Sequence, residues 1–313
     1  MTKTKGKRMS RVMRDRIKWG FIFISPWVLG FLLFILYPML ASLYYSFTDY
    51  DVLRPARWVG AENYIYFFTK DNLSYLTVYN TLYFAFFSVP LGILVAIILA
   101  LLLNTKVKGQ SVFRAIFFIP TVVPVVAATI LWVWLFSTRN GLINMALEAM
   151  GLPAVAWLNS PTWSKPAMII MSLWGVGTSV VIYLAGLQDI PVSLYEAAVI
   201  DGANWWQQTT RITVPLLTPQ IFFQLVIGLI GAFQVFTQAF IMGGTGGGAL
   251  GMGTEAGPSN SLLFYTLYLY LNAFRFFRMG YASAMAWLLF LITLVATLII
   301  LRTSSRWVFY GRL

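Results

Sequence analysis

The sequence predicts an all-α integral membrane protein with six transmembrane helices. Of its 313 residues, 59% are hydrophobic and only 10% are charged, and the mean hydropathy is +0.76. Soluble domains have about a quarter of their residues charged, so the composition excludes an ordinary globular protein. A membrane-spanning helix needs about 20 apolar residues to cross the hydrocarbon layer. Six runs reach that length, at roughly 19–46, 76–103, 112–136, 166–188, 219–242 and 280–302.

The distribution of Lys and Arg predicts the topology. Residues 1–18 form a basic tail that holds 8 of the 22 basic residues and a single acid, Asp15. Basic residues favour the cytoplasmic side, and an even number of spans puts both termini on that side. This arrangement leaves 15 basic residues inside and 7 outside, and it makes 189–218 a cytoplasmic loop. We expect a disordered tail, a transmembrane domain over 19–313 and no nucleic-acid partner, since topology accounts for the net charge of +12.

The other apolar segments are too short to span a membrane. The patch 65–68 and the stretches 142–150 and 262–274 are expected to form helices at the outer membrane surface. Residues 243–258 contain eight glycines and are expected to be mobile. The run that starts at residue 19 is too long for a secretory signal, and no small-residue cleavage site follows it.

Several kinds of chemistry are excluded by the residue types that the chain lacks. It has no Cys and no His, so it has no thiol or His-assisted nucleophile and no Cys/His metal site, and no metal centre is expected. It has no G-x-x-x-x-G-K-[ST] motif that would hold ATP. The acidic candidate within the spans is Asp189, whose place at a helix end fits a boundary residue better than an ion relay. We therefore expect a protein that is not itself an enzyme.

The loop 189–218 carries the signals of two short helices. The capping-box pairs, in which each side chain bonds the other residue's backbone N–H, are Ser193 with Glu196 and Asn204 with Gln207. Gly202 lies between them, where a glycine can end the first helix in the left-handed conformation. Pro215 is expected to end the second helix, and Thr218 followed by a proline is expected to cap and start the next long one.

The same loop resembles a known family motif. The pattern is Glu-Ala-Ala, three residues, Gly, nine residues, Ile, one residue, an aliphatic residue and Pro, and at average residue usage a chance match is on the order of one in 10^5. The matching residues are Glu196, Ala197, Ala198, Gly202, Ile212, Val214 and Pro215. The pattern resembles the EAA loop of ABC-importer permeases, with Val214 where Leu is usual. Ile200, Asp201, Ala203 and Trp206 resemble the carbohydrate-uptake branch of that family.

The resemblance implies the six-helix fold of type I ABC-importer permeases, in a bacterial cytoplasmic membrane. One such chain supplies half of the translocation pathway. The resemblance therefore also implies a second homologous permease, two ATPase subunits that carry ATP and Mg, and an extracytoplasmic substrate-binding protein. No cofactor is expected in this chain itself. The loop would dock on an ATPase subunit, with Gly202 for the turn, Ala197 and Ala198 for close contact, and Glu196 as a cap and a charge contact.

Polar and aromatic residues within the spans are the candidates for a substrate pathway. Sugars are bound by amides and hydroxyls on their OH groups and by aromatic rings on their C–H faces. The candidates are Gln234, Gln238 and Phe233 in the fifth span, Trp174 and Tyr183 in the fourth, and Asn80 in the second. Gln234 and Gln238 are four residues apart and are expected to share a helix face. The alternative for each is a helix-packing hydrogen bond.

The spans contain no Lys or Arg expected to face a pathway, which favours a neutral mono- or oligosaccharide. Two alternatives remain open at this point. One is an ABC permease for another solute, such as glycerol phosphate, a peptide or an amino acid. The other is an ion-coupled secondary carrier, which would normally need more carboxylates within its spans.

Overall fold

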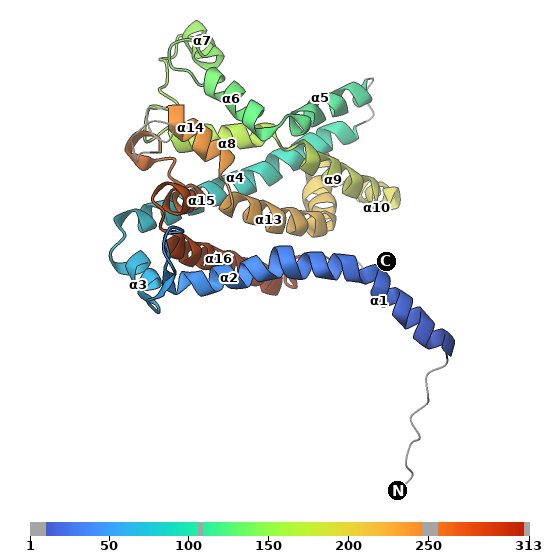
Figure 1. The fold of residues 1–313 in the computed structure, drawn as a ribbon. Helices are drawn as coiled ribbons and strands as arrows, with labels where there is room; N and C mark the ends of the chain where they lie inside the picture. Colours follow the sequence, from blue (N-terminus) through green and yellow to red (C-terminus); the bar gives the residue numbers. More distant parts are fainter. Residues whose placement is uncertain (1–10, 106–108, 246–255, 310–313) are drawn as a thin grey trace.

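The computed structural model describes residues 11–105, 109–245 and 256–309, and helices dominate them (Figure 1). The long helices are α4 (Asn72–Asn104) and α16 (Met279–Ser304), together with the run of α1 (Arg11–Phe31), the π-turn η1 (Leu32–Leu36) and α2 (Tyr37–Ser46). The shorter ones are α5 (Gln110–Val122), α6 (Val125–Leu135), α8 (Ser164–Trp174), α9 (Gly177–Gln188), α13 (Thr218–Phe233) and α14 (Thr237–Thr245).

Three helices are long and apolar enough to cross a membrane without a break. They are Val12–Ser46, Asn72–Asn104 and Met279–Ser304, and they correspond to the predicted spans 19–46, 76–103 and 280–302. The first begins earlier than predicted, because residues 11–18 are helical. The expectation of a disordered tail is wrong for these residues, since Arg, Lys and Met are good helix formers and extend the helix that follows. Residues 1–10 of the predicted tail lie outside the described residues.

The other predicted spans are bent, and counting each bent helix pair as one span gives the predicted six. The span 112–136 is broken into α5 and α6 with an angle of 101°. Val123 is extended there, with ψ 127°, because Pro124 disfavours a helical conformation in the residue before it. The span 166–188 is broken into α8 and α9 at 50°. The pair Trp205–Leu216 and Thr218–Phe233 is bent by 62°.

The fifth predicted span, 219–242, is not one continuous helix. It ends at Phe233, and α14 starts at Thr237. The Val235 carbonyl in the break accepts a hydrogen bond from the Thr266 hydroxyl, which replaces a bond within the helix. The Gly-rich stretch predicted at 243–258 lies mostly outside the described residues.

Short elements lie at the ends of the spans, as predicted. The segment 65–68 lies within α3 (Glu62–Thr69), and 142–150 corresponds to α7 (Leu142–Ala149). The segment 262–274 corresponds to α15 (Tyr265–Tyr270) and the π-turn η4 (Leu271–Arg275). Figure 1 shows α3, α7, α14 and α15 at one end of the molecule, and α10 with the N-terminal part of α1 at the other.

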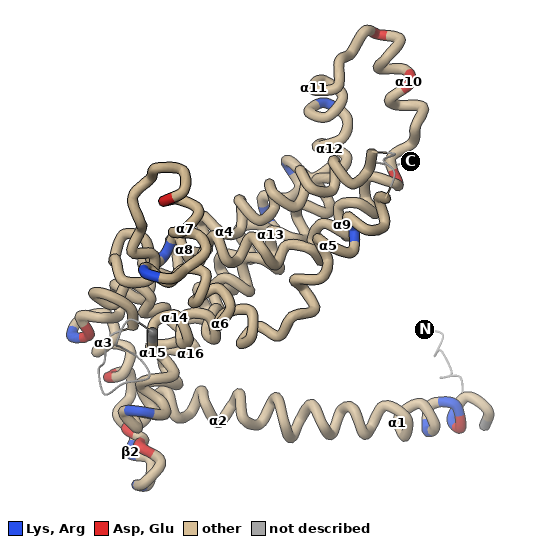
Figure 2. Tube along the Cα trace, turned by 90° about the horizontal axis from the view of Figure 1, so that it is seen from above, with Lys and Arg blue, Asp and Glu red and all other residues tan. Residues whose placement is uncertain are grey.

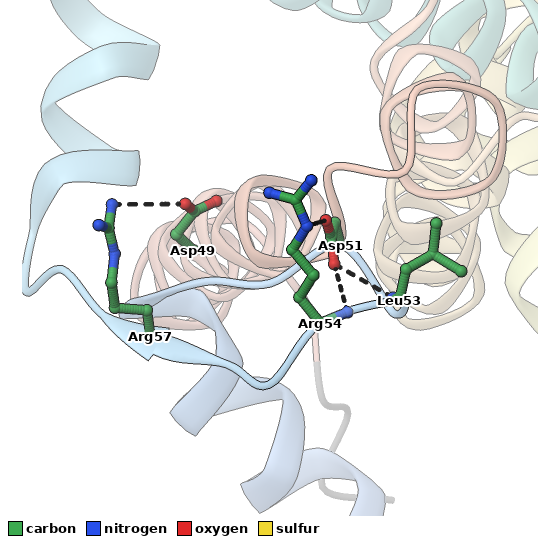
Figure 3. Close-up of polar contacts among 5 residues, drawn as sticks. All are labelled: Asp49, Asp51, Leu53, Arg54 and Arg57. Atoms are coloured by element: carbon green, nitrogen blue, oxygen red, sulfur yellow. Dashed lines mark hydrogen bonds and ion pairs between the residues drawn. The ribbon is translucent and has the colours of Figure 1, made fainter.

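A small antiparallel ladder between α2 and α3 was not predicted. Thr48–Asp49 (β1) pairs with Arg57–Trp58 (β2). Figure 3 shows the polar contacts of its connecting loop. Asp49 Oδ2 lies 3.6 Å from Arg57 Nη2, and Asp51 accepts bonds from the backbone N–H groups of Leu53 and Arg54 at 3.1 and 2.8 Å. The Asp51 contacts close a tight turn, so the carboxylates organise local structure here.

A buried carboxylate–tyrosine cluster joins three elements at the same end. Asp71 caps α4 by accepting a bond from Leu73 N at 2.9 Å. Its carboxylate also accepts bonds from the Tyr268 hydroxyl, at 2.9 and 3.0 Å, and from the Tyr281 hydroxyl. Burial raises the pKa of Tyr268, and its hydrogen bond to Asp71 raises that pKa further, so the phenol remains a donor. The cluster ties the starts of α4 and α16 to α15.

The buried apolar residues form two clusters along the length of the bundle. The larger lies toward the end with α3, α7 and α15, and it includes Phe84, Met168, Phe233, Phe264, Tyr265 and Met285. The smaller lies toward α10, and it includes Ala96, Ala100, Val180, Tyr183, Leu187 and Leu217. Residues of the predicted loop 189–218 pack on the smaller cluster, among them Ile190, Tyr195 and Leu217.

Candidate coupling loop and translocation cavity

The loop predicted at 189–218 is a helix–turn–helix that projects from the body of the protein. Its helices are α10 (Val192–Ile200) and α11 (Trp205–Gln208), which continues through the π-turn η2 (Thr209–Thr213) into α12 (Val214–Leu216). Figure 2 shows α10, α11 and α12 standing clear of the other helices, near the N-terminal end of α13. The predicted architecture of this loop is therefore present.

The turn between the two helices is built around Gly202. Its φ of +75° lies in the left-handed region that favours glycine. The N–H of Ala203 bonds the Ala198 carbonyl at 2.8 Å, and the N–H of Gly202 bonds the Val199 carbonyl at 3.0 Å. This pair of bonds is the Schellman arrangement, which closes a helix C-terminus. The predicted role of Gly202 in the turn is confirmed.

The second helix starts as predicted but ends differently. Asn204 Oδ1 accepts from Gln207 N at 2.9 Å, and Gln207 Oε1 accepts from Asn204 N at 2.8 Å, which is a complete capping box. Pro215 does not end the helix, because it lies at the start of α12, where a missing N–H costs little. Thr218 does not cap α13 with its side chain but donates to the Pro215 carbonyl at 2.6 Å.

The first predicted capping box, Ser193 with Glu196, is not formed. Helix α10 begins at Val192 after Pro191, two residues earlier than that box requires, and no side chain caps it. Among the described residues, neither side chain takes part in a hydrogen bond or ion pair, and both are exposed. Glu196 is therefore free to meet a group outside this chain.

One side chain of α10 anchors it to the body. The Tyr195 hydroxyl lies 2.9 Å from Thr213 Oγ1, so α10 and η2 are bridged across the turn. The Tyr195 ring also packs against the smaller buried cluster. The bridge thereby links α10 to the segment that leads into α13, because α12 and α13 follow η2 directly.

The tip of the loop carries an exposed apolar surface, which we call the apolar tip. It consists of Val199, Ile200, Trp205 and Trp206. Ile200 is 86% exposed, and both tryptophans are about two-thirds exposed. A contiguous apolar patch of this kind on a projecting element marks a protein or membrane contact. Ala197 and Asp201 are exposed beside it, whereas Ala198 and Ile212 are half-buried.

A cavity of about 230 Å³ lies among α4, α8, α9, α13 and α14. Its polar side chains are Ser88, Ser172, Ser179, Gln224 and Gln238, and apolar residues such as Phe84 and Val235 surround them. Three glycines, Gly92, Gly228 and Gly231, widen it on two helices. Hydroxyls and amides set in an apolar wall are the groups that suit a polar, uncharged solute.

The structure brings only one of the predicted pathway residues into this cavity. Gln238 lines it, but Gln234 is exposed at the end of α13. The two glutamines do not share one helix face, because the helix is broken between them. Phe233 is buried in the larger cluster, and Trp174 packs edge to face on Trp132 with ring centroids 6.1 Å apart.

The other two predicted pathway residues hold the fold together. Tyr183 is fully buried in the smaller cluster. Asn80 donates from Nδ2 to the carbonyls of Asn260 and Leu263 at 3.0 and 3.1 Å, which fixes the segment before α15. The alternative of a packing hydrogen bond fits Asn80, whereas the buried Tyr183 hydroxyl has no hydrogen-bond partner among the described residues. The Asn80 Oδ1 atom accepts a hydrogen bond from Lys165 Nζ at 3.0 Å.

Sequence reasoning missed two cavity residues, Ser88 and Ser172. Small hydroxyl residues are common in membrane helices, so only their spacing could have identified them. Ser88 lies two turns after Asn80 on α4, close to one face. The sequence also put Lys165 in an outer loop, whereas the structure has it in the first turn of α8.

Comparisons with known proteins agree with this architecture. Residues 88–308 match the family described as "Binding-protein-dependent transport system inner membrane component". A relative from Bacillus subtilis, the "Probable ABC transporter permease protein YesP", is 40% identical, with 97% of this chain and 96% of the relative covered. The "Sulfoquinovosyl glycerol transport system permease protein SmoG" of Agrobacterium fabrum is 32% identical, with 90% and 88% covered.

A solved structure has the same fold. It is a chain of "a bacterial ABC transporter involved in the import of the acidic polysaccharide alginate", and it aligns with a TM-score of 0.79 and 26% identity over 95% of this chain and 99% of that one. The predicted fold class is thereby confirmed. The chain belongs to the family of inner membrane components of binding-protein-dependent transport systems, and it is an ABC transporter permease.

Proposed function

We propose that this chain imports a carbohydrate as one of two permease subunits, driven by ATP hydrolysis on two cytosolic ATPase subunits and fed by an extracytoplasmic substrate-binding protein. The observation that carries the proposal is the apolar tip on the projecting loop. A soluble environment would make such a surface unfavourable, so a partner that covers it is expected. ATP and Mg are held by the partner, because the sequence has no P-loop of its own.

The coupling step follows from the way the loop is anchored. Closure of the ATPase pair would push on α10, and the bridge from Tyr195 to Thr213 carries that push to α12 and α13. Helix α13 lines the cavity through Gln224, so its movement changes access to the cavity. This is alternating access in which Glu196, Ala197, Ala198 and Gly202 form the contact with the ATPase. The Asp201, Ile212 and Pro215 positions complete that contact.

The orientation in the membrane follows from the same partner. The ATPases are cytosolic, so α10, the start of α1 and the end of α16 lie on the cytoplasmic side. Phe309 N donates to Thr218 Oγ1 at 2.8 Å, which puts the C-terminal end beside the loop. The positive-inside pattern of the sequence supports the same orientation.

A carbohydrate as the substrate is supported by the cavity and by the relatives. The cavity offers Ser, Gln and aromatic groups without a charged residue in its wall. The relatives' names refer to the acidic polysaccharide alginate and to sulfoquinovosyl glycerol, both of them sugars or sugar derivatives. Glycerol phosphate import and ion-coupled transport are the competing functions.

Co-purification tests the ATPase contact. Ile200→Asp puts a carboxylate in the apolar tip, and burying an aliphatic side chain contributes about 1.5–3 kcal/mol, so we expect at least about tenfold less ATPase retained by the tagged permease. Phe68→Asp is the matched control, since Phe68 is a similarly exposed apolar residue on α3, at the opposite end. Equal ATPase retention by both variants would contradict the docking role of the tip.

Transport in proteoliposomes tests the energy source. With the co-purified partners and the binding protein, sugar uptake should require internal ATP and should continue in the presence of an ionophore. Uptake by this chain alone that an ionophore abolishes would establish an ion-coupled carrier instead.

A further inference from the structure

Four aromatic residues follow one another at four-residue intervals along α4. We call them the aromatic stripe: Tyr75, Tyr79, Tyr83 and Phe87. The last three rings contact in sequence, with centroids 6.2 Å apart between Tyr79 and Tyr83 and 4.7 Å apart between Tyr83 and Phe87. Tyr75 is 80% exposed and Tyr79 is 47% exposed. The stripe is therefore open at the Tyr75 end, whereas Tyr83 is half-buried and packs against the larger buried cluster.

A lysine is held over this stripe. Lys165 Nζ lies 4.9 Å from the centroid of the Tyr79 ring and 5.2 Å from that of Tyr83, within the range of a cation–π contact. It also donates to Asn80 Oδ1 at 3.0 Å. The Asn80 Nδ2 group donates to two backbone carbonyls, and these bonds fix the orientation in which Asn80 Oδ1 faces Lys165.

The charge of Lys165 is not neutralised within the described part of the chain. The ion pairs found there involve Arg54 and Arg57, and no carboxylate lies within 4.0 Å of Lys165. An ammonium group has three N–H donors, and Asn80 uses one of them. Charged side chains in membrane helices face water-filled space or an opposite charge rather than lipid. Within the described part of the chain, Lys165 is thus a cation beside the stripe with no anionic partner of its own.

We propose that Lys165 and the aromatic stripe bind an acidic sugar, with the Lys165 ammonium on its carboxylate and the exposed rings against its C–H faces. The proposal rests on carbohydrate import as proposed above and narrows its substrate class. It concerns a site outside the cavity that Gln238 lines, since Lys165 lies in the first turn of α8 and is not part of that cavity's wall.

The spacing of the stripe suits a chain of sugar units. Residues four apart on a helix are separated by about 6 Å along its axis, which is comparable to one pyranose unit. A uronate carries its carboxylate on the sugar ring itself. A sugar ring stacked on Tyr75 therefore brings that carboxylate toward the ammonium held one turn further along. Aromatic faces and a charged donor that are already in position limit the entropy lost on binding.

Sugar binding to the assembled permease–ATPase complex, in nanodiscs and without the binding protein, tests the site. The probes are a fluorescently end-labelled uronate trisaccharide prepared from alginate and its carboxyl-reduced, neutral counterpart. We expect the wild type to prefer the uronate. Lys165→Gln should weaken uronate binding at least tenfold and leave the neutral sugar within about twofold, because a charge-assisted bond is lost only for the uronate. Rising salt should reduce the preference.

Three further variants separate recognition from folding. Lys165→Arg keeps the charge and should keep the preference for the uronate. Tyr75→Leu changes an exposed ring and should weaken both sugars to a similar extent. Lys70→Gln is the matched control, since Lys70 is an exposed lysine at the end of α3, and it should change neither sugar.

The outcomes that overturn the proposal are distinct. A wild type that binds both sugars equally, or loses both equally in Lys165→Gln, contradicts recognition of the carboxylate and leaves carbohydrate import standing. Loss of the second permease from the Lys165→Gln complex would assign Lys165 to the interface between the permeases instead. Failure of ATP-driven uptake for both sugars would overturn the proposed function itself.

Discussion

The carboxylate–tyrosine cluster at Asp71 allows a quantitative stability test. Asp71→Ala removes the acceptor of two buried phenols, Tyr268 and Tyr281, and the N-cap of α4. An unsatisfied buried donor costs about 1–3 kcal/mol, so two of them cost about 2–6 kcal/mol. Loss of the cap adds about 1 kcal/mol. We expect the free energy of unfolding to fall by about 3–7 kcal/mol.

The assay is reversible unfolding in mixed micelles, followed by the fluorescence of the 12 tryptophans. Glu62→Ala is the control, because Glu62 is an exposed carboxylate on the neighbouring helix α3. Tyr281→Phe should cost about 1.5 kcal/mol, the lower end for a bond to a charged group. If the cluster acts as a unit, the double variant Asp71→Ala with Tyr281→Phe should cost less than the two single changes added together. A loss in Asp71→Ala no larger than in Glu62→Ala would refute the reasoning.

Three further predictions concern other elements. Burial raises the pKa of Tyr268, so the folded protein keeps this proton at a pH where the unfolded chain has lost it. The free energy of unfolding should therefore fall as the pH rises above about 10, the ordinary pKa of tyrosine. In alkaline unfolding curves, the Tyr268→Phe variant should show a smaller fall. A Cβ at Gly177 would overlap the Phe117 carbonyl, so Gly177→Val should destabilise the protein by about 1–3 kcal/mol in the same micelle assay, and more than Gly20→Val, where the space is open. Tyr195→Phe removes the bond to η2 and should cost about 1 kcal/mol, seen as faster amide exchange in α10 with little change elsewhere.

The number of spans and the coupling loop could be predicted because both depend on local sequence. Apolar length identifies a span, and a glycine between two capping patterns identifies a turn, as at Gly202. The loop's motif spans only 20 residues, so its residues stay together in any fold. The failure of the Ser193 cap has a local cause too, since α10 begins immediately after Pro191, two residues too early for Ser193 to cap it.

The cavity residues could not be predicted in the same way. Gln234 and Gln238 share a face only if the helix is continuous, and the break that separates them is stabilised by Thr266, about 30 residues later in the chain. Asn80 is a residue type that often binds sugars, but its amide donates to carbonyls of the segment before α15. The place of Lys165 over two tyrosines of α4 likewise depends on contacts between distant segments.

The pairing of α2 with α16 has a consequence for how the protein is made. Helix α2 packs on α16, and Trp287 Nε1 donates to Ser42 Oγ at 3.2 Å between them. None of the most apolar window of Val12–Ser46 is buried within the chain. The earliest helix of this sequence therefore has α16 as its main partner in the chain. Until α16 is inserted, this helix must remain in the lipid without that partner, and its apolar length is sufficient for that. More than 200 residues separate the end of α2 from the start of α16. A chain that stopped before α16 would leave the earliest helix inserted but without its main partner in the chain.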